Sequence, residues 1–246
     1  MRKTDLVLKK TYDCTRDDDD RLTVVMIHGI ASASYTYDKA LEYFRDTQKF
    51  QKIRFVTFDL LGSGRSLSSD ELNYDYDEQI AALHNAIHQL NAKSPIVLVG
   101  HSLGTFIVTR YTSTYPDDIN QLILVSPPIY TPEDFKNPAF AIGIEMFKKS
   151  VSVKNPHILQ ERPFNNSMEN IVLDINNYSY LTKLKTKTTL IYGNEDAIIA
   201  SYNIPELLKK NSNLSAIKTI GRHGVTYDKF TKIGKILEES LNAKTI

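Results

Sequence analysis

Short apolar runs alternate with longer stretches of helical period along most of this chain, and this alternation limits the folds it can adopt. The runs that predict strands are residues 5–13, 22–27, 53–58, 96–99, 121–125, 188–192 and 215–220. The stretches that predict helices are 35–47, 76–91, 103–115, 201–211 and 225–243. Strands that alternate with helices form a mostly parallel sheet covered on both faces. We therefore predict an α/β fold, whose binding site lies at the carboxyl ends of the strands.

Size and charge narrow the class of protein further. A chain of 246 residues with 41% hydrophobic content can bury one substantial core, so we expect a single domain, 1–246. Its 30 basic and 29 acidic residues nearly balance, and no basic stripe alternates with aromatic residues, which argues against nucleic acid as a partner. The basic residues near Met1 are followed by no apolar stretch long enough for a signal peptide, and no later segment approaches the length of a membrane span, so we expect neither. We expect a cytoplasmic protein and leave its oligomeric state open.

The strongest chemical signal is the sequence Gly-His-Ser-Leu-Gly at residues 100–104, directly after one predicted strand and directly before a predicted helix. A serine on such a turn is held in a crowded backbone conformation, and glycines at positions 100 and 104 let the helix pass close to the strand. Ser102 is therefore a candidate nucleophile, with a serine in an ordinary glycine turn as the alternative. A serine hydroxyl also needs a base, an acid and an oxyanion site.

Two later segments offer the base and the acid. His223 lies in Gly-Arg-His-Gly, just after the predicted strand 215–220, and is the candidate general base. Asp196 ends the sequence Gly-Asn-Glu-Asp after the strand 188–192, and is the candidate carboxylate that orients the imidazole. Glu195 is the alternative acid, less favoured by its position. Ser102, Asp196 and His223 together form a candidate catalytic triad.

The first strong strand, 22–27, leads into His28, Gly29 and Ile30. A glycine there lets the backbone turn an N–H toward a reacting carbonyl, so the candidate oxyanion-hole donors are the N–H groups of Ile30 and of Leu103, which begins the helix after the nucleophile. We predict that His28 has a structural role in fixing this loop and does not transfer protons in the reaction. Asp59 opens a glycine-rich turn, and we expect its carboxylate to cap that turn.

Taken together, these motifs resemble those of the α/β-hydrolase superfamily, specifically its small capped serine hydrolases of esterase and lipase type. The motifs are His28-Gly29, the turn 59–66, the elbow 100–104, the segment 193–196 and His223. The resemblance spans nearly the whole chain, and the family uses the same order of nucleophile, acid and base. It implies a mostly parallel central sheet flanked by helices on both faces, with a helical cap inserted after the sixth core strand. Because only residues 5–14 precede the charged turn 16–21, we expect one of the family's edge strands to be missing or merged.

The expected place for the cap is the long interval without a strong strand, residues 129–183, between core segments 1–128 and 184–246. Its apolar side chains are Phe135, Phe140, Ile142, Ile144, Met146 and Phe147. They form either a lid that favours an acyl or aromatic substrate group, or the face that packs the cap onto the core, as any helical lid requires.

The resemblance implies hydrolysis of a carboxyl ester or related acyl bond of a small-molecule substrate, through an acyl-enzyme on Ser102 and without a cofactor. The same triad serves acyltransferases and C–C bond hydrolases, and the same scaffold hosts catalytically weak ligand receptors. The sequence leaves these alternatives open.

Other suggestive residues carry less weight. His84 and His88 have a spacing that can bind metal on a helix, but the sequence places no acid or third histidine with them, so we expect exposed helix residues and no metal site. The aspartates at 17–20 lack the spaced ligands of a calcium loop and predict a solvated turn. The single cysteine, Cys14, excludes an internal disulfide and is expected to be half-buried at a strand.

Overall fold

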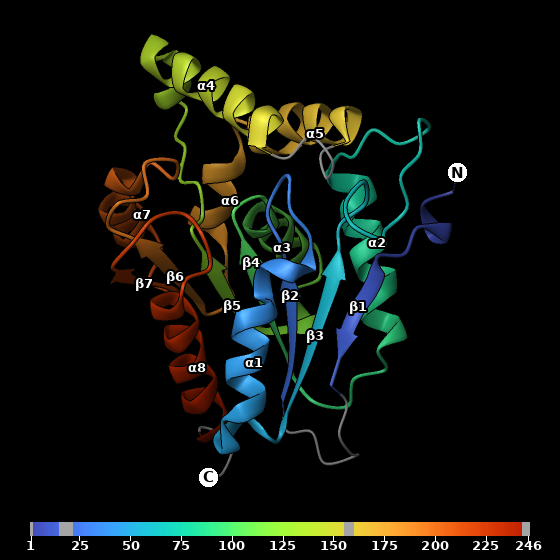
Figure 1. Ribbon diagram of the computed structural model, residues 1–246. Coiled ribbons are helices and arrows are strands. Elements are labelled where there is room, and N and C mark those ends of the chain that lie inside the picture. Colours follow the sequence, from blue (N-terminus) through green and yellow to red (C-terminus); the bar gives the residue numbers. More distant parts are fainter. Residues whose placement is uncertain (1, 15–21, 155–159, 243–246) are drawn as a thin grey trace.

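The computed structural model describes residues 2–14, 22–154 and 160–242, and the predicted turn at 17–20 lies outside them. In these residues the strands form a single seven-stranded sheet of order β1-β3-β2-β4-β5-β6-β7, in which β1 runs antiparallel to β3 and the other neighbours are parallel (Figure 1). The strands are β1 (Lys9–Asp13), β2 (Leu22–Ile27), β3 (Ile53–Asp59), β4 (Ile96–His101), β5 (Ile119–Val125), β6 (Thr188–Gly193) and β7 (Leu214–Thr219). The predicted α/β fold is confirmed.

Helices cover both faces of the sheet (Figure 1). They are α1 (Asp38–Asp46), α2 (Tyr76–Gln89), α3 (Leu103–Thr114), α4 (Pro138–Lys154), α5 (Glu161–Ser167), α6 (Asn177–Lys183), α7 (Ile204–Lys210) and α8 (Tyr227–Asn242). Helices α1 and α8 pack with one set of strand side chains, including Val24 and Val99. Helices α2, α3, α6 and α7 pack with the alternate set, including Val25 and Leu98. Because successive strand side chains point to opposite faces, the buried strands are apolar on both sides.

The structure corrects the predicted boundaries near the amino-terminal edge. A 3₁₀ turn occupies Lys3–Asp5, so the strand predicted from residue 5 begins only at Lys9. No strand precedes β1 in the described residues, which fits the expectation of a missing edge strand. As a consequence, the long inserted segment follows β5, the fifth strand of this sheet, and the predicted position after a sixth core strand is wrong for this chain.

Cys14 is half-buried just after β1, as predicted, and its sulfur accepts a hydrogen bond from the Phe55 N–H at 3.0 Å.

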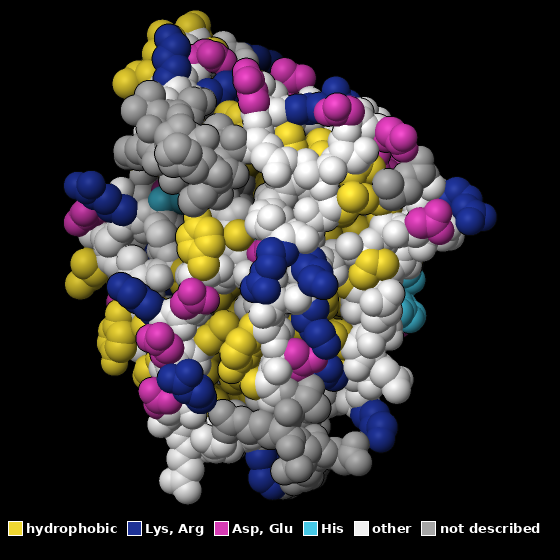
Figure 2. All heavy atoms as spheres, turned by 45° about the vertical axis from the view of Figure 1, so that its right-hand side comes forward, with side chains coloured by type: hydrophobic (Ala, Val, Ile, Leu, Met, Phe, Trp, Pro, Cys, Tyr) yellow, Lys and Arg dark blue, Asp and Glu magenta, His cyan; other side chains and the backbone are white. Residues whose placement is uncertain are grey.

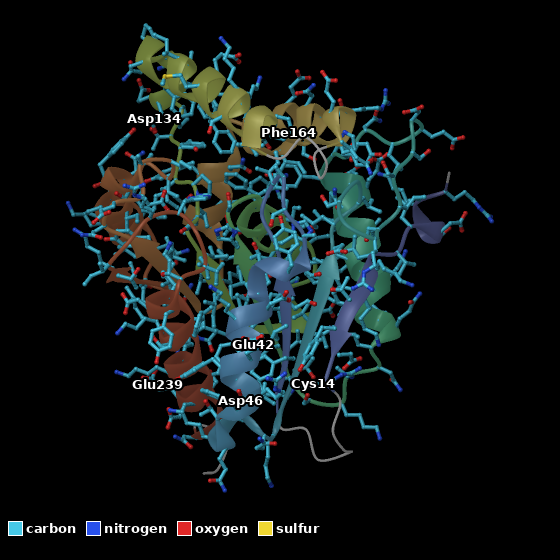
Figure 3. The ribbon with its side chains drawn as sticks, in the orientation of Figure 1. Cys14, Glu42, Asp46, Asp134, Phe164 and Glu239 are labelled. Carbon is cyan, nitrogen blue, oxygen red and sulfur yellow. The ribbon has the colours of Figure 1, made fainter. Side chains whose placement is uncertain are left out.

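The inserted segment 129–183 contains α4, α5, a π-helical turn (Met168–Val172) and α6. Helices α4 and α5 lie beyond the carboxyl ends of the strands (Figure 1). Phe164, labelled on α5 in Figure 3, is 95% buried because it joins the core cluster on the α2 and α3 side of the sheet. The segment is therefore packed onto the core through apolar contacts.

A carboxylate ties the start of the inserted segment to the loop after β6. Asp134, at the base of α4 in Figure 3, accepts hydrogen bonds from the Thr131 N–H at 2.7 Å, the Tyr202 hydroxyl at 2.5 Å and the Asn203 amide at 2.9 Å. Burial alone would raise the pKa of Asp134, but these hydrogen bonds outweigh it and lower that pKa. The ionised carboxylate thus joins two segments that are far apart in the sequence.

Two glycines allow α3 to pass close to the sheet. A Cβ atom at Gly104 would lie 2.4 Å from the carbonyl oxygen of Ile27, and one at Gly100 would lie 2.7 Å from the carbonyl oxygen of Gly104. Because these contacts are with backbone atoms, a side chain at either position would displace the helix. The close approach fixes the turn between β4 and α3, on which Ser102 lies.

The outer surface carries both signs of charge. Figure 2 shows Lys and Arg side chains spread over one face among Asp and Glu side chains and hydrophobic groups. In the described part of the chain, no helix combines the length and the hydropathy needed to cross a membrane.

Candidate active site

Ser102 occupies a strained turn at the carboxyl end of β4. Its backbone has φ 51° and ψ −118°, a conformation that residues other than glycine rarely adopt. The turn is held by hydrogen bonds from the Ser102 N–H to the Val125 carbonyl at 3.0 Å and from the Thr105 N–H to the Ser102 carbonyl at 2.9 Å. The strain is therefore maintained by the surrounding backbone at the edge of the sheet where α/β folds bind ligands.

The structure brings the three candidate triad residues together. His223 Nε2 lies 2.8 Å from Ser102 Oγ, and His223 Nδ1 lies 3.0 Å from each carboxylate oxygen of Asp196. Asp196 follows β6 and His223 follows β7, so parallel strands carry both side chains to the same edge of the sheet. Glu195, the alternative acid, keeps a side chain that is 58% exposed and lies 3.9 Å from Arg222. The geometry therefore places Asp196, and not Glu195, beside the imidazole.

The environment of Asp196 favours its ionised form. Burial would raise the pKa of Asp196, but hydrogen bonds from His223, the Ile198 N–H and the Ser126 hydroxyl lower it overall. An ionised carboxylate facing Nδ1 keeps the proton on that nitrogen and leaves Nε2 as an acceptor toward Ser102. The arrangement can accept a proton from the serine hydroxyl.

The candidate oxyanion-hole residues border the same space as Ser102. Ile30 and Leu103 both line the cavity into which Ser102 faces. The neighbouring Gly29 lies so close that a Cβ atom there would be 2.9 Å from the Ser102 Cβ. The loop after β2 therefore approaches the nucleophile as closely as its glycine permits.

His28 and Asp59 hold the loops around this site. His28 is buried, its Nε2 accepts from the Leu60 N–H at 3.0 Å, and its Nδ1 donates to the Gly29 carbonyl at 2.7 Å. Burial lowers the pKa of His28, so the ring is neutral and fits the predicted role of fixing the loop. Asp59 accepts from the Arg65 N–H at 2.9 Å, which is the predicted capping of its own turn. It also accepts from the Ser34 N–H at 2.8 Å and so holds the loop after β2.

A cavity of about 220 Å³ adjoins the serine. Its core wall comprises Ile30, Ser102, Leu103, Pro128, Tyr130, Ala197 and Ile198. Its wall from the inserted segment comprises Ala139, Phe140, Gly143, Ile144, Phe147, Met168 and Val172. The lining is mainly apolar, and such a space suits a hydrocarbon group better than a charged one.

Sequence reasoning missed a buried lysine that supports the histidine loop. Lys229 on α8 is fully buried, and its Nζ donates to the Ser126 hydroxyl at 2.7 Å and to the carbonyls of Arg222 at 2.5 Å and Gly224 at 2.9 Å. Burial lowers the pKa of Lys229 to about 8, although the Asp196 charge opposes this shift. Two of its acceptors flank His223 directly. A lysine on the otherwise apolar face of the predicted helix was the available signal.

His101 supports the same loop from the other side. Its Nε2 donates to the His223 carbonyl at 2.9 Å, and burial lowers the pKa of His101 to about 3, so the ring stays neutral. Because Nε2 carries the proton, Nδ1 is the lone-pair nitrogen, and it has no hydrogen-bond partner among the described residues. The loop that carries His223 is therefore bonded from both β4 and α8.

The prediction for His84 and His88 is wrong in one respect. His84 is half-buried, and Asp118 lies with the two histidines, so that one ligand atom from each residue lies within 4.8 Å of the others. Asp118 follows α3, which packs on the same face of the sheet as α2. An acid 30 positions beyond His88 could not be placed there from local sequence spacing.

Comparison with known proteins gives the class. The sequence model of the family described as having the α/β-hydrolase fold matches residues 23–147, just over half of the chain, and the chain belongs to this family. It is 30% identical over 132 residues to probable lysophospholipase BODYGUARD 2 of Arabidopsis thaliana, a match that covers 53% of this chain and 28% of that protein. It is 31% identical over 121 residues to the human (lyso)-N-acylphosphatidylethanolamine lipase, covering 48% of this chain and 33% of the lipase. The chain thus spans about a third or less of these relatives.

A solved structure matches over almost the full length. The esterase of Exiguobacterium antarcticum superposes with a TM-score of 0.70 at 16% sequence identity, and the match covers 96% of each chain. At this identity the likeness concerns the fold alone.

Proposed function

We propose that this protein is a serine hydrolase that cleaves a carboxyl ester or related acyl bond of a small substrate. The observation that carries the proposal is the hydrogen-bonded chain from Ser102 through His223 to Asp196 beside an apolar cavity. A nucleophile bonded to a base, with the base bonded to an orienting carboxylate, is the arrangement that activates a serine hydroxyl. The family membership supports the same reaction type.

In the proposed mechanism, His223 Nε2 takes the hydroxyl proton as Ser102 Oγ attacks the carbonyl carbon of the substrate. The N–H groups of Ile30 and Leu103 bind the oxyanion, and Asp196 stabilises the imidazolium. The intermediate collapses to an acyl-enzyme as His223 returns the proton to the leaving group. A water molecule then gives a proton to His223 Nε2 as its oxygen attacks the acyl carbon. When this second intermediate collapses, the bond from the acyl carbon to Ser102 Oγ breaks, His223 returns the proton to Ser102 Oγ, and the acid is released.

In this proposal, residues 129–183 act as a cap over one core made of 1–128 and 184–246, and the cavity between them holds the acyl chain. An apolar cavity of about 150 Å³ can hold a benzene-sized group. The cavity of about 220 Å³ therefore favours an acyl chain of roughly six to ten carbons. The lipase and lysophospholipase names of the matched relatives support a lipid-like acyl substrate.

Covalent labelling tests the proposal directly. We expect a fluorophosphonate probe to add one phosphonyl group to the protein, seen by intact mass, and peptide mapping to place it on Ser102. Steady turnover of p-nitrophenyl esters should accompany the labelling. Absence of both would overturn the proposal and favour a ligand-binding protein. Formation of a new ester when an alcohol is added, at the expense of the free acid, would identify an acyltransferase on the same triad.

Filling the cavity from the cap side should change chain-length preference. Gly143 on α4 lines the cavity, and a Cβ atom there would meet no described residue within 4 Å, so a leucine can enter the space without a backbone clash. Each excluded methylene costs about 0.8 kcal/mol of binding, so Gly143→Leu should lower kcat/KM for the octanoyl ester about tenfold. The acetyl ester should change little.

Ala141→Leu is the matched control for this prediction, because Ala141 is exposed on the same helix and does not line the cavity. Its esterase profile should match the wild type. An equal loss for acetyl and octanoyl esters in Gly143→Leu would contradict the assignment of this cavity to the acyl chain.

Lys229 should impose an alkaline limit on activity. Below pH 8 its ammonium group can donate to all three acceptors, whereas the neutral amine above pH 8 has only two N–H groups and leaves one acceptor without a partner. We expect kcat/KM of the wild type to fall about threefold as pH rises from 7 to 9.5. Lys229→Met should be less active at pH 7 and should not show this fall. The same decline in both proteins would show that Lys229 does not cause it.

A further inference from the structure

We propose that His84, His88 and Asp118 bind a divalent transition-metal ion, with Zn²⁺ the ion that suits them best. This site is separate from the candidate active site, and the proposal does not depend on the hydrolase function. Helix α2 supplies both histidines, one turn apart, and the 3₁₀ turn Pro116–Asp118 between α3 and β5 supplies the carboxylate.

The three side chains are close enough to share one ion. Their ligand atoms lie within 4.8 Å of one another, and His84 Nδ1 is 3.9 Å from Asp118 Oδ2. Tetrahedral Zn²⁺ with bonds of about 2.0–2.1 Å needs ligand atoms about 3.4 Å apart. His84 Nδ1 and Asp118 Oδ2 must therefore approach each other by about 0.5 Å through a small movement of their own side chains. The distances that involve His88 must shorten by at most about 1.4 Å, which rotation of its exposed side chain can supply.

Neighbouring aromatic residues already orient two of the proposed ligands. The Tyr111 hydroxyl donates to Asp118 Oδ2 at 2.8 Å, and the Tyr115 ring stacks on His84 with centroids 4.0 Å apart and planes 18° apart. Hydrogen bonds to ligating carboxylates and contacts that fix imidazole rings are typical supports of metal sites, because they reduce the ordering needed on binding. The His88 side chain, by contrast, is exposed to solvent.

The donor set selects the class of ion. Two imidazole nitrogens and one carboxylate oxygen suit Zn²⁺, Co²⁺ or Ni²⁺, whereas Mg²⁺ and Ca²⁺ prefer oxygen ligands alone. Three protein ligands leave one tetrahedral position for water or another ligand.

The position in the fold indicates a structural role for the ion. The carboxyl-terminal half of α2 leads to the start of β4, and Asp118 directly precedes β5, so the cluster lies at the amino ends of the strands. Ser102 lies at the carboxyl end of β4, and therefore at the opposite end of the strands from the cluster. A bound ion would link α2 to the start of β5 and would not contact the acyl substrate.

Calorimetric titration of Zn²⁺ into chelator-treated protein tests this site. We expect saturable binding of one ion, weakened at least about tenfold by His88→Gln and by Asp118→Asn. Asp117→Asn is the matched control, because Asp117 is an exposed acid adjacent to Asp118, and it should bind as the wild type does. With Co²⁺ in place of Zn²⁺, the wild type should show the strong visible absorption of tetrahedral coordination, and His88→Gln should lose it.

Three results would overturn the proposal. The first is absence of saturable Zn²⁺ binding by the wild type. The second is binding that both His88→Gln and Asp118→Asn retain unchanged. The third is binding that disappears instead in Asp196→Asn, which would place the ion at the candidate active site. Because His88 is exposed and Asn can still accept the Tyr111 hydrogen bond, both variants should fold, and circular dichroism verifies this.

Discussion

Replacing Ser102 with alanine is expected to lower kcat for p-nitrophenyl octanoate at least about 10³-fold, with a much smaller change in KM. The substitution removes the only oxygen that His223 Nε2 contacts at 2.8 Å among the described side chains, so no acyl-enzyme can form. The remaining backbone donors and the cavity can still bind the ester, which is why substrate affinity should persist. Steady-state kinetics with intact-mass analysis measure both effects.

Ser113→Ala is the matched control for that substitution. Ser113 lies on the same helix, α3, at an exposed position, and its hydroxyl donates to the Thr109 carbonyl of that helix at 2.9 Å. Its activity should stay within about twofold of the wild type. Near-normal ester turnover by Ser102→Ala, with unchanged circular dichroism, would show that Ser102 is not the nucleophile.

Asp196→Asn is expected to lower kcat on the order of 10³-fold while leaving the fold intact. In the wild type, both carboxylate oxygens lie 3.0 Å from His223 Nδ1, and hydrogen bonds keep the carboxylate ionised despite its burial. A neutral amide cannot stabilise the imidazolium and can reverse the tautomer by donating to Nδ1. The pH dependence of kcat/KM and the rate of fluorophosphonate labelling should both record the loss.

Glu195→Gln separates this effect from a general loss of negative charge at the β6 turn. Its side chain is mostly exposed and lies 3.9 Å from Arg222, so the exchange should change kcat less than about twofold. If Glu195→Gln proved the more damaging change, Glu195 and not Asp196 would be the acid.

The parts of the fold that could be predicted are those with a strong local signal. Runs such as 22–27 and 121–125 are apolar except for Thr23 and Gln121, because their strands are buried on both faces. A nearly continuous apolar run between turn residues identifies such strands. The start of β1 was predicted too early, because Leu6 and Leu8 are buried without belonging to a strand. An apolar side chain indicates that a residue is buried, but burial alone does not specify its backbone conformation.

The residues of the candidate site likewise fall into those with a strong local sequence signal and those without one. Ser102, Asp196 and His223 follow strand ends in recognisable short motifs, and the parallel sheet then brings strand ends together. Lys229 could not be assigned a partner, since its acceptors include Ser126, which lies 103 positions earlier in the sequence. Asp118 likewise meets the histidines of α2 only through the packing of α3. Contacts between distant segments depend on packing that periodicity does not encode.

The two walls of the cavity come from different stretches of the chain. Ile30 and Ile198 belong to loops after strands of the sheet and Leu103 begins α3, whereas Phe140 and Gly143 belong to α4 of the inserted segment. Substitutions in the inserted segment can therefore reshape the space for a ligand while the backbone that carries Ser102 and His223 stays where it is. Reactivity and selectivity become separately adjustable, so a library confined to α4 and the turn Met168–Val172 should yield variants with new substrate ranges and an unchanged rate of covalent labelling.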